Sequence, residues 1–270
     1  MPVANVTKTS WLSHIPRFAV LLLVARGAAF SQSGNVRFAE TGVAEFKAAY
    51  EAWDSARFEA AVTLFRRAAT NAPSNATNFY WLGAAQFHRM LQLQTSPGSR
   101  TNETVAKAAL DAAVDALTTA VKLDGRHAES HALLGTLYGM KIDGSIFRAL
   151  RFGPSVQNHQ KLALKYGADN PRVRYLLGMC QFHTADGKGE WREALETLQS
   201  AEKLYEKEAE TVASPLEARW GHSSCVTFIG RSFEKLGQRK EAATYFRRAL
   251  EMHAQEGAAR DGLKRVAEPK

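Results

Sequence analysis

Two histidines and two cysteines are the residues whose spacing in this 270-residue chain could support chemistry. His127 and His131 are four residues apart, so on a helix they would share one face as a pair of metal ligands. A zinc site needs three or four ligands, and no Cys or carboxylate at ligand spacing completes this pair. We therefore interpret both as solvated histidines at the start of a helix, and we expect no metal site and no cofactor.

Cys180 and Cys225 are the two cysteines of the chain. An exported protein could join them in a disulfide, or both could be buried thiols that pack as small hydrophobic side chains. The sequence leaves both alternatives open, because a disulfide needs its Cα atoms about 5.5 to 6 Å apart. No basic residue is placed to lower a thiol pKa, and the chain contains no nucleophile elbow or phosphate loop. We predict that the protein is not an enzyme.

Composition indicates a globular protein, because 45% of the residues are hydrophobic and 23% are charged. The formal net charge is +8, and three basic residues lie in the first 33 positions, which hold no Asp or Glu. Elsewhere the basic residues alternate with acids, as in Glu202-Lys203, which is typical of solvated helix faces. We expect no nucleic-acid partner.

Residues 1–33 are predicted to be a signal peptide. A basic stretch ends at Arg17, an apolar run covers residues 18–25, and small residues follow up to Ser33. Eight apolar residues are too few to cross a bilayer about 30 Å thick, so we expect no permanent membrane anchor. The predicted location of the mature domain, residues 34–270, is the periplasm. An acid-free leader with Arg and Ser also fits a mitochondrial transit peptide, the alternative for a eukaryotic chain.

A repeated pattern organises the chain beyond residue 40: an apolar residue followed by glycine opens each of four units. The glycines are Gly83, Gly135, Gly178 and Gly230. Small residues at fixed places in a helix pair allow two helices to approach closely. We predict that these glycines are packing positions.

The last unit has the most specific spacing. Its residues Gly230, Phe233, Ala242, Phe246 and Ala249 fall at the spacings of the tetratricopeptide-repeat (TPR) motif. Over residues 41–267 the chain resembles the TPR family. It is similar in particular to bacterial exported TPR proteins with a Gly-rich turn in the penultimate unit and a Trp-Gly before the final one. No activity carries over from that group.

This resemblance implies an all-α, right-handed TPR-like α-solenoid of about five helix pairs, with inserted loops and a C-terminal capping helix. The predicted units cover residues 42–75, 76–127, 128–170, 171–221 and 222–255, and the cap covers residues 256–267. We expect inserted loops at residues 92–104, where Pro and Gly interrupt the helical pattern, and at residues 139–154.

The function implied by the resemblance lies on the concave wall of the solenoid, where one helix of each unit faces a shared groove. The predicted partner-binding residues are Phe46, Tyr50, Trp53, Tyr80, Phe87, His88, Met140, Tyr175, Phe182, His183 and Arg231. A wall rich in aromatic side chains favours a helical or extended peptide held in side-chain pockets. We predict a non-catalytic scaffold in the cell envelope that binds a protein or peptide partner.

Two alternatives stay open. The apolar insertion at residues 139–154 could fold back and fill the groove, so that the protein is a structural spacer or an assembly subunit. A pocket between that insertion and the groove could instead hold a small molecule.

Overall fold

The computed structural model describes residues 37–95 and 99–267, and within these ranges the chain is helical without strands. The predicted signal peptide over residues 1–33 lies outside the described residues. None of the helices in the described ranges is long and apolar enough to cross a bilayer.

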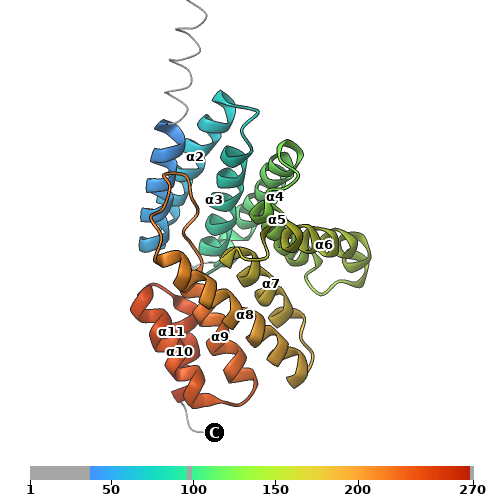
Figure 1. Cartoon of the computed structure of the whole chain (residues 1–270), viewed down its shortest axis with the longest axis vertical. Helices are drawn as coiled ribbons and strands as arrows, with labels where there is room; N and C mark the ends of the chain where they lie inside the picture. Colours follow the sequence, from blue (N-terminus) through green and yellow to red (C-terminus); the bar gives the residue numbers. More distant parts are fainter. Residues whose placement is uncertain (1–36, 96–98, 268–270) are drawn as a thin grey trace, which may run out of the picture.

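Consecutive helices pack in pairs that stack into a superhelix (Figure 1). Residues 37–52 are helical and precede α2. The later helices are α2 (Ser55–Asn71), α3 (Ala76–Thr95), α4 (Ser99–Leu123), α5 (Ala128–Ile142), α6 (Ile146–Gly167), α7 (Pro171–Thr184), α8 (Lys188–Ala209), α9 (His222–Lys235), α10 (Arg239–Met252) and α11 (Gly257–Ala267). The predicted series of five helix pairs with a C-terminal helix is thus confirmed.

Polar side chains fix the starts of several helices. The carboxylate of Asp54 accepts a hydrogen bond from the Arg57 amide at 2.9 Å, and Asn170 accepts from the first amides of α7. His127 is the N-cap of α5, since its Nδ1 accepts from the Ser130 amide at 3.3 Å. These contacts satisfy amides that have no partner inside the helix.

The predicted packing role of the glycines is confirmed by the space around them. A Cβ atom on Gly83 would lie 2.5 Å from Leu117, and one on Gly178 would lie 2.8 Å from Leu198. Such approaches are too close for any larger side chain without movement of a neighbour. The two helices of each of these pairs therefore meet at a glycine.

The two predicted loops are mostly helical. In the first, α3 continues to Thr95 and α4 begins at Ser99, with residues 96–98 outside the described ranges. In the second, only residues 143–145 form the turn, where Asp143 and Gly144 have positive φ values of 43° and 70°. Ser145 then caps α6, and Pro154 lies within that helix. Gly144 and Pro154 suggested a long loop in the sequence, but the helix already begins after its N-cap, Ser145.

The last helix covers the end of the superhelix as predicted. Ala259, Gly262 and Val266 of α11 are buried, and Gly262 lies directly against the Phe246 ring of α10. This arrangement removes the apolar end of the final repeat from water.

Candidate functional site

The centre of the concave side is filled by the chain itself, at residues 216–221 between α8 and α9, called here the closing segment. Trp220 is 4% exposed, and its ring lies 4.8 Å from that of His88. Its indole N–H donates to the Tyr80 hydroxyl at 3.1 Å, while the Trp81 indole donates to the Leu216 carbonyl at 2.9 Å. The closing segment therefore occupies the space that a bound peptide would need.

Contacts with α8 hold the end of the closing segment. The Tyr205 hydroxyl donates to the Trp220 carbonyl at 3.1 Å, and the Arg219 guanidinium donates to the Glu208 carbonyl. Gly221 has a φ of +97°, and a Cβ atom there would lie 2.6 Å from the Tyr205 hydroxyl. This position requires glycine for both reasons.

A buried ion cluster lies beneath the closing segment. Arg172 of α7 bonds Glu129 of α5 at 2.7 Å and both carboxylate oxygens of Glu208 in α8, at 3.0 and 2.5 Å. Burial alone would raise the pKa of Glu129, but the neighbouring Arg172 cation lowers it overall. The cluster joins three helices, so Arg172 is engaged inside the protein.

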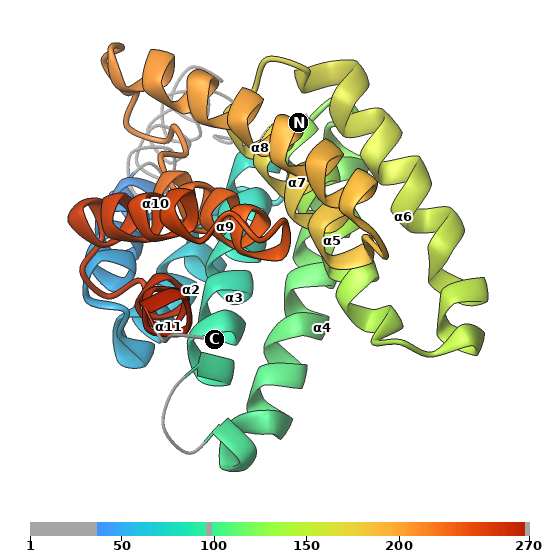
Figure 2. The ribbon, with the colours of Figure 1, turned by 90° about the horizontal axis from the view of Figure 1, so that it is seen from below.

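The first and last helix pairs also meet (Figure 2). Nε2 of His253, which follows α10, hydrogen-bonds the Tyr50 carbonyl at 2.9 Å, and its ring stacks on that of Tyr50 at 5.2 Å. The Glu256 carboxylate raises the pKa of His253 from its ordinary value, against the effect of burial. The superhelix is therefore closed between its ends.

The expected open aromatic wall is corrected by these contacts. Tyr50, Trp53 and Met140 are half-buried, whereas six of the predicted residues are buried: Phe46, Tyr80, Phe87, His88, Tyr175 and Phe182. Trp220 of the closing segment packs on Tyr80 and His88, whereas Phe182 is covered by Phe228 and Arg231 of α9.

The alternative in which residues 139–154 fill the groove names the wrong segment. Ile146, Phe147 and Leu150 are 76%, 86% and 74% exposed. They lie on the first turns of α6, which extends away from the concave side (Figure 1). The closing segment fills the groove instead, and the Trp220-Gly221 pair was the one feature of that segment that the sequence analysis singled out.

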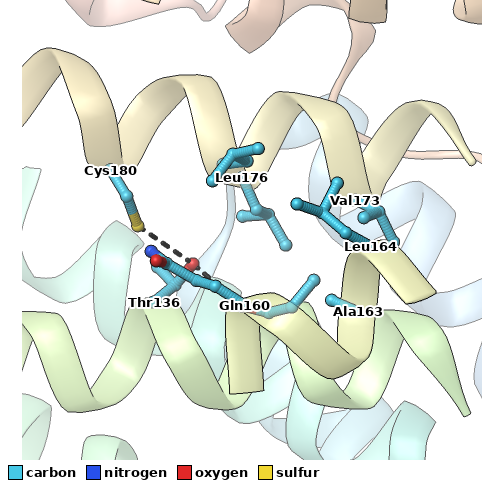
Figure 3. A pocket seen from close by; sticks show the side chains of 9 residues that line it. Thr136, Gln160, Ala163, Leu164, Val173, Leu176 and Cys180 are labelled. Atoms are coloured by element: carbon cyan, nitrogen blue, oxygen red, sulfur yellow. Dashed lines mark hydrogen bonds between the residues drawn. The ribbon is translucent and has the colours of Figure 1, made fainter. Parts of the chain in front are cut away.

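A small cavity lies between the helices of the third and fourth pairs, and it is too small for an organic ligand. Thr136, Gln160 and Cys180 line a cavity of about 10 Å³ between α5, α6 and α7 (Figure 3). This volume holds one water molecule at most. No residue of the range 139–154 lines this cavity, so the small-molecule alternative stays a prediction.

The two cysteines are free thiols in separate surroundings. Cys180 lies 3.7 Å from the Thr136 hydroxyl, and Cys225 donates to the Leu198 carbonyl at 3.4 Å. Burial raises the pKa of both thiols. The structure therefore shows two free thiols, with Cys225 buried and Cys180 partly buried.

An open cleft remains at the other end of the concave side, between α7, α9 and α11, and we call it the C-terminal cleft. Its volume is about 760 Å³. Its lining residues are Phe182, Arg231, Glu234, Lys235, Gly237, Arg239, Ala258, Asp261 and Arg265. Two predicted partner-binding residues, Phe182 and Arg231, thus line one cleft, and the exposed His183 lies beside them, with its ring 5.5 Å from that of Phe228.

The cations of the C-terminal cleft differ in their partners. Arg265 pairs with both oxygens of Glu234 at 2.8 and 2.9 Å, and Arg239 donates to the Arg265 and Val266 carbonyls. The Arg231 guanidinium instead lies over the Phe182 and Phe228 rings at 4.7 and 4.6 Å. Lys235 lies 5.2 Å from the Trp191 ring. Within residues 37–95 and 99–267, neither Arg231 nor Lys235 has a carboxylate at ion-pair distance.

Comparison with known protein families gives one match that covers most of the chain. The family model described as Regulator of microtubule dynamics protein 1-3 matches residues 43–268, from within the first helix to the end of α11. The chain belongs to this family. No curated protein matches it.

Solved structures show that this member of the regulator of microtubule dynamics family has the TPR fold. A thermophilic TPR protein of Thermus thermophilus, TTC0263, is similar with a TM-score of 0.57 and 16% identity, over 84% of this chain and 98% of that one. The Cut9–Hcn1 hetero-tetramer of APC/C is similar with a TM-score of 0.56 and 13% identity, over 88% of this chain and 41% of that one.

In this family member, the histidines predicted to be solvated have structural contacts. His131 is buried, and its Nδ1 lies 2.8 Å from Nδ1 of His159 in α6. Burial lowers the pKa of His159 to about 4. No group of three His, Cys, Asp or Glu side chains suited to a metal ion occurs in the described part of the chain.

Proposed function

We propose that this protein is a non-catalytic scaffold that binds an acidic peptide segment of a partner protein in the C-terminal cleft. The observation that carries the proposal is the pair of cations, Arg231 and Lys235, beside the Phe182 ring in a cleft of about 760 Å³. The cleft lining carries Arg231, Lys235, Arg239 and Arg265 against the carboxylates of Glu234 and Asp261. A concave surface with such an excess of positive charge attracts an anionic ligand. The TPR fold supports the choice of a peptide, because stacked helix pairs present an extended concave surface.

The electrostatics of the cleft favour acidic side chains or a carboxyl terminus. Burial lowers the pKa of Arg231 from its ordinary value, which shows that the guanidinium is partly removed from water. A bound carboxylate would replace part of the lost hydration. Next to the cation, the half-buried Phe228 gives an apolar side chain of the peptide a surface to pack on. The matching ligand is therefore a short segment that combines Asp or Glu with one apolar residue.

Fluorescence anisotropy with labelled peptides tests this proposal. The probes are Glu- and Asp-containing peptides with one Leu, beside matched peptides in which Gln and Asn replace the acids. We expect the acidic peptides to bind the full chain. The variant Arg231→Gln/Lys235→Gln should bind them about tenfold more weakly, since two lost charge contacts of about 0.7 kcal/mol each amount to about 1.4 kcal/mol.

A matched control separates the cleft from general charge. Lys203 on α8 and Lys240 on α10 are exposed, and they are absent from the residues that line the C-terminal cleft. The variant Lys203→Gln/Lys240→Gln removes the same charge and should bind like the unmodified chain. Equal loss in both double variants, or equal binding of acidic and neutral peptides, would contradict the proposal.

The family description suggests the first protein partner to test. Because the family is described as regulators of microtubule dynamics, we propose microtubules as that partner. Co-sedimentation of the full chain with purified microtubules should be competed by the acidic peptides that bind the cleft. Co-sedimentation that the peptides do not affect would place microtubule binding at another surface.

A further inference from the structure

The first turns of α6, residues 146–151, form an apolar tip whose large apolar side chains are exposed to solvent. Ile146, Phe147 and Leu150 are each about three-quarters exposed or more. With 3.6 residues per turn, these three positions lie within an arc of about 100° on the helix. Three large apolar side chains grouped in water mark an interaction surface.

The tip projects beyond the helix that supports the rest of α6. Tyr138 of α5 stacks on the Phe152 ring at 5.8 Å and on the His159 ring at 5.7 Å, and both of these residues follow the three apolar residues of the tip. A Cβ atom added at Gly144 or Gly153 would meet no atom within 4 Å. The tip is therefore open to a partner, and α6 stands out from the body in Figures 1 and 2.

The charge of α6 limits the choice of partner. The helix from Ile146 to Gly167 carries Arg148, Arg151, Lys161 and Lys165 and no Asp or Glu. The nearest acid in the turn, Asp143, pairs with Arg148 at 3.2 Å. Two copies of such a helix repel each other, which disfavours self-association through the tip. The partner surface must be anionic and must also accept apolar side chains.

The size of the tip distinguishes a bilayer from a protein. Three side chains offer on the order of 500 Å² of surface, whereas a stable protein interface buries about 800 Å² on each partner. A bilayer needs no such area, because inserted apolar side chains and anionic headgroups together give reversible binding.

We propose that the α6 tip docks this protein on anionic lipid bilayers. Ile146, Phe147 and Leu150 insert among the acyl chains, while Arg148 and Arg151 contact the headgroups. This docking is peripheral and reversible, and it does not depend on the C-terminal cleft.

Vesicle co-sedimentation of the full chain tests the proposal, with phosphatidylcholine vesicles and with vesicles that also contain phosphatidylserine. We expect stronger binding to the anionic vesicles and a loss of about tenfold or more in the variant Ile146→Ser/Phe147→Ser/Leu150→Ser. The variant Arg148→Gln/Arg151→Gln should lose the preference for phosphatidylserine. Every variant is the full chain, so any contribution of the apolar run at residues 18–25 is common to all.

Val212 and Met252 provide the control, because they are exposed apolar side chains outside the tip, at 97% and 44%. The variant Val212→Ser/Met252→Ser should bind vesicles like the unmodified chain. Equal vesicle binding by the tip variant and the unmodified chain would overturn the proposal, as would equal losses in the tip variant and this control.

A fluorescent label locates the contact. An environment-sensitive dye on the variant Phe147→Cys should shift its emission to the blue on anionic vesicles, whereas the same dye on Val212→Cys should not. The native Cys225 is fully buried and Cys180 is mostly covered, so the introduced thiol reacts selectively. A label at residue 147 that stays in water on sedimented vesicles overturns the proposal. A shift with an acidic protein and none with vesicles overturns it in favour of a protein partner.

Discussion

The six-residue pattern Gly-x-x-Gln-Phe-His occurs twice, at residues 83–88 in α3 and at residues 178–183 in α7. Both copies place their glycine against the second helix of the same pair. The first copy is buried under Trp220, which covers His88 and fills the groove. In the second copy Phe182 lies beside Arg231, and His183 is exposed at the open cleft. The same local sequence thus lies in a closed core in one place and at the edge of an open cleft in the other, because only the first copy meets the closing segment.

The largest effect should come from removing the closing side chain. Trp220→Ala leaves a cavity over His88 and removes one hydrogen-bond partner of the Tyr80 hydroxyl. We therefore expect a loss of about 3–5 kcal/mol in the free energy of unfolding. Urea unfolding followed by circular dichroism measures it. Val212→Ala, at an exposed position of the same link, should change stability by about 0.5 kcal/mol or less. A Trp220 variant as stable as the Val212 variant would break the comparison.

The next effect is a dependence on pH that separates the two histidines. Burial lowers the pKa of His88 from 6.5 to about 4 in the folded protein. Between pH 4 and 6.5 His88 therefore binds a proton in the unfolded chain but not in the folded chain. The contribution of neutral His88 to the free energy of unfolding is complete above pH 6.5 and decreases as the pH falls toward 4. The loss is about 3 kcal/mol.

Two matched variants measure this contribution. His88→Phe should flatten the dependence of stability on pH between 6.5 and 4, when urea unfolding is measured across that window. His183→Phe should change the profile less, since the His183 side chain is exposed. Equal effects of the two substitutions would show that burial does not separate the two copies.

His253 should give a smaller dependence of stability on pH, with the opposite sign. Its pKa is raised by Glu256. Its stabilisation is therefore complete below the ordinary value of 6.5 and is lost as the pH rises through the folded value. His253→Gln removes the ring contact with Tyr50 and the charge beside Glu256, and it should cost about 1 kcal/mol. Urea unfolding should show a larger cost at pH 6 than at pH 8; the reverse order would contradict the assignment.

The smallest effect should come from a substitution in the C-terminal cleft that changes the shape of a side chain and keeps its charge. Arg231→Lys keeps the cation but loses the planar group that stacks on Phe182 and Phe228. We expect binding of the acidic peptides to weaken about threefold, equivalent to about 0.7 kcal/mol, with unchanged unfolding. A measured affinity equal to that of the unmodified chain would assign the interaction to charge alone.

The repeat architecture was predictable because its contacts are local. Gly83, Gly178 and Gly230 mark the close approach of helices that follow one another in sequence, and a short-range pattern records it. The helical stretches within residues 92–104 and 139–154 were predicted as loops because they contain proline and glycine, which are typical of loops. The start of α6 is marked in the sequence by one N-cap residue, Ser145, which is a weaker signal.

The closing segment was not predictable from the same pattern. Trp220 and Tyr80 are 140 residues apart, and residues 216–221 have no repeat spacing of their own. The C-terminal cleft was not predicted as such, although two of the predicted groove residues line it. Phe182 and Arg231 belong to the repeat positions, but Arg265 lies on the cap, which the groove positions of the family do not include.

The central claim is that residues 216–221 close the groove and leave the C-terminal cleft as the open surface of the concave side. The rate of thiol labelling tests it most directly, on the full-chain variants Ala218→Cys and Val212→Cys, with the unmodified chain giving the background from Cys180 and Cys225. Ala218 is 5% exposed and Val212 is 97% exposed. The account predicts that Cys at residue 212 reacts at once and that Cys at residue 218 reacts about a hundredfold more slowly, because reaction requires local opening. Equal rates at the two positions would show that the segment leaves the groove, and would contradict the account.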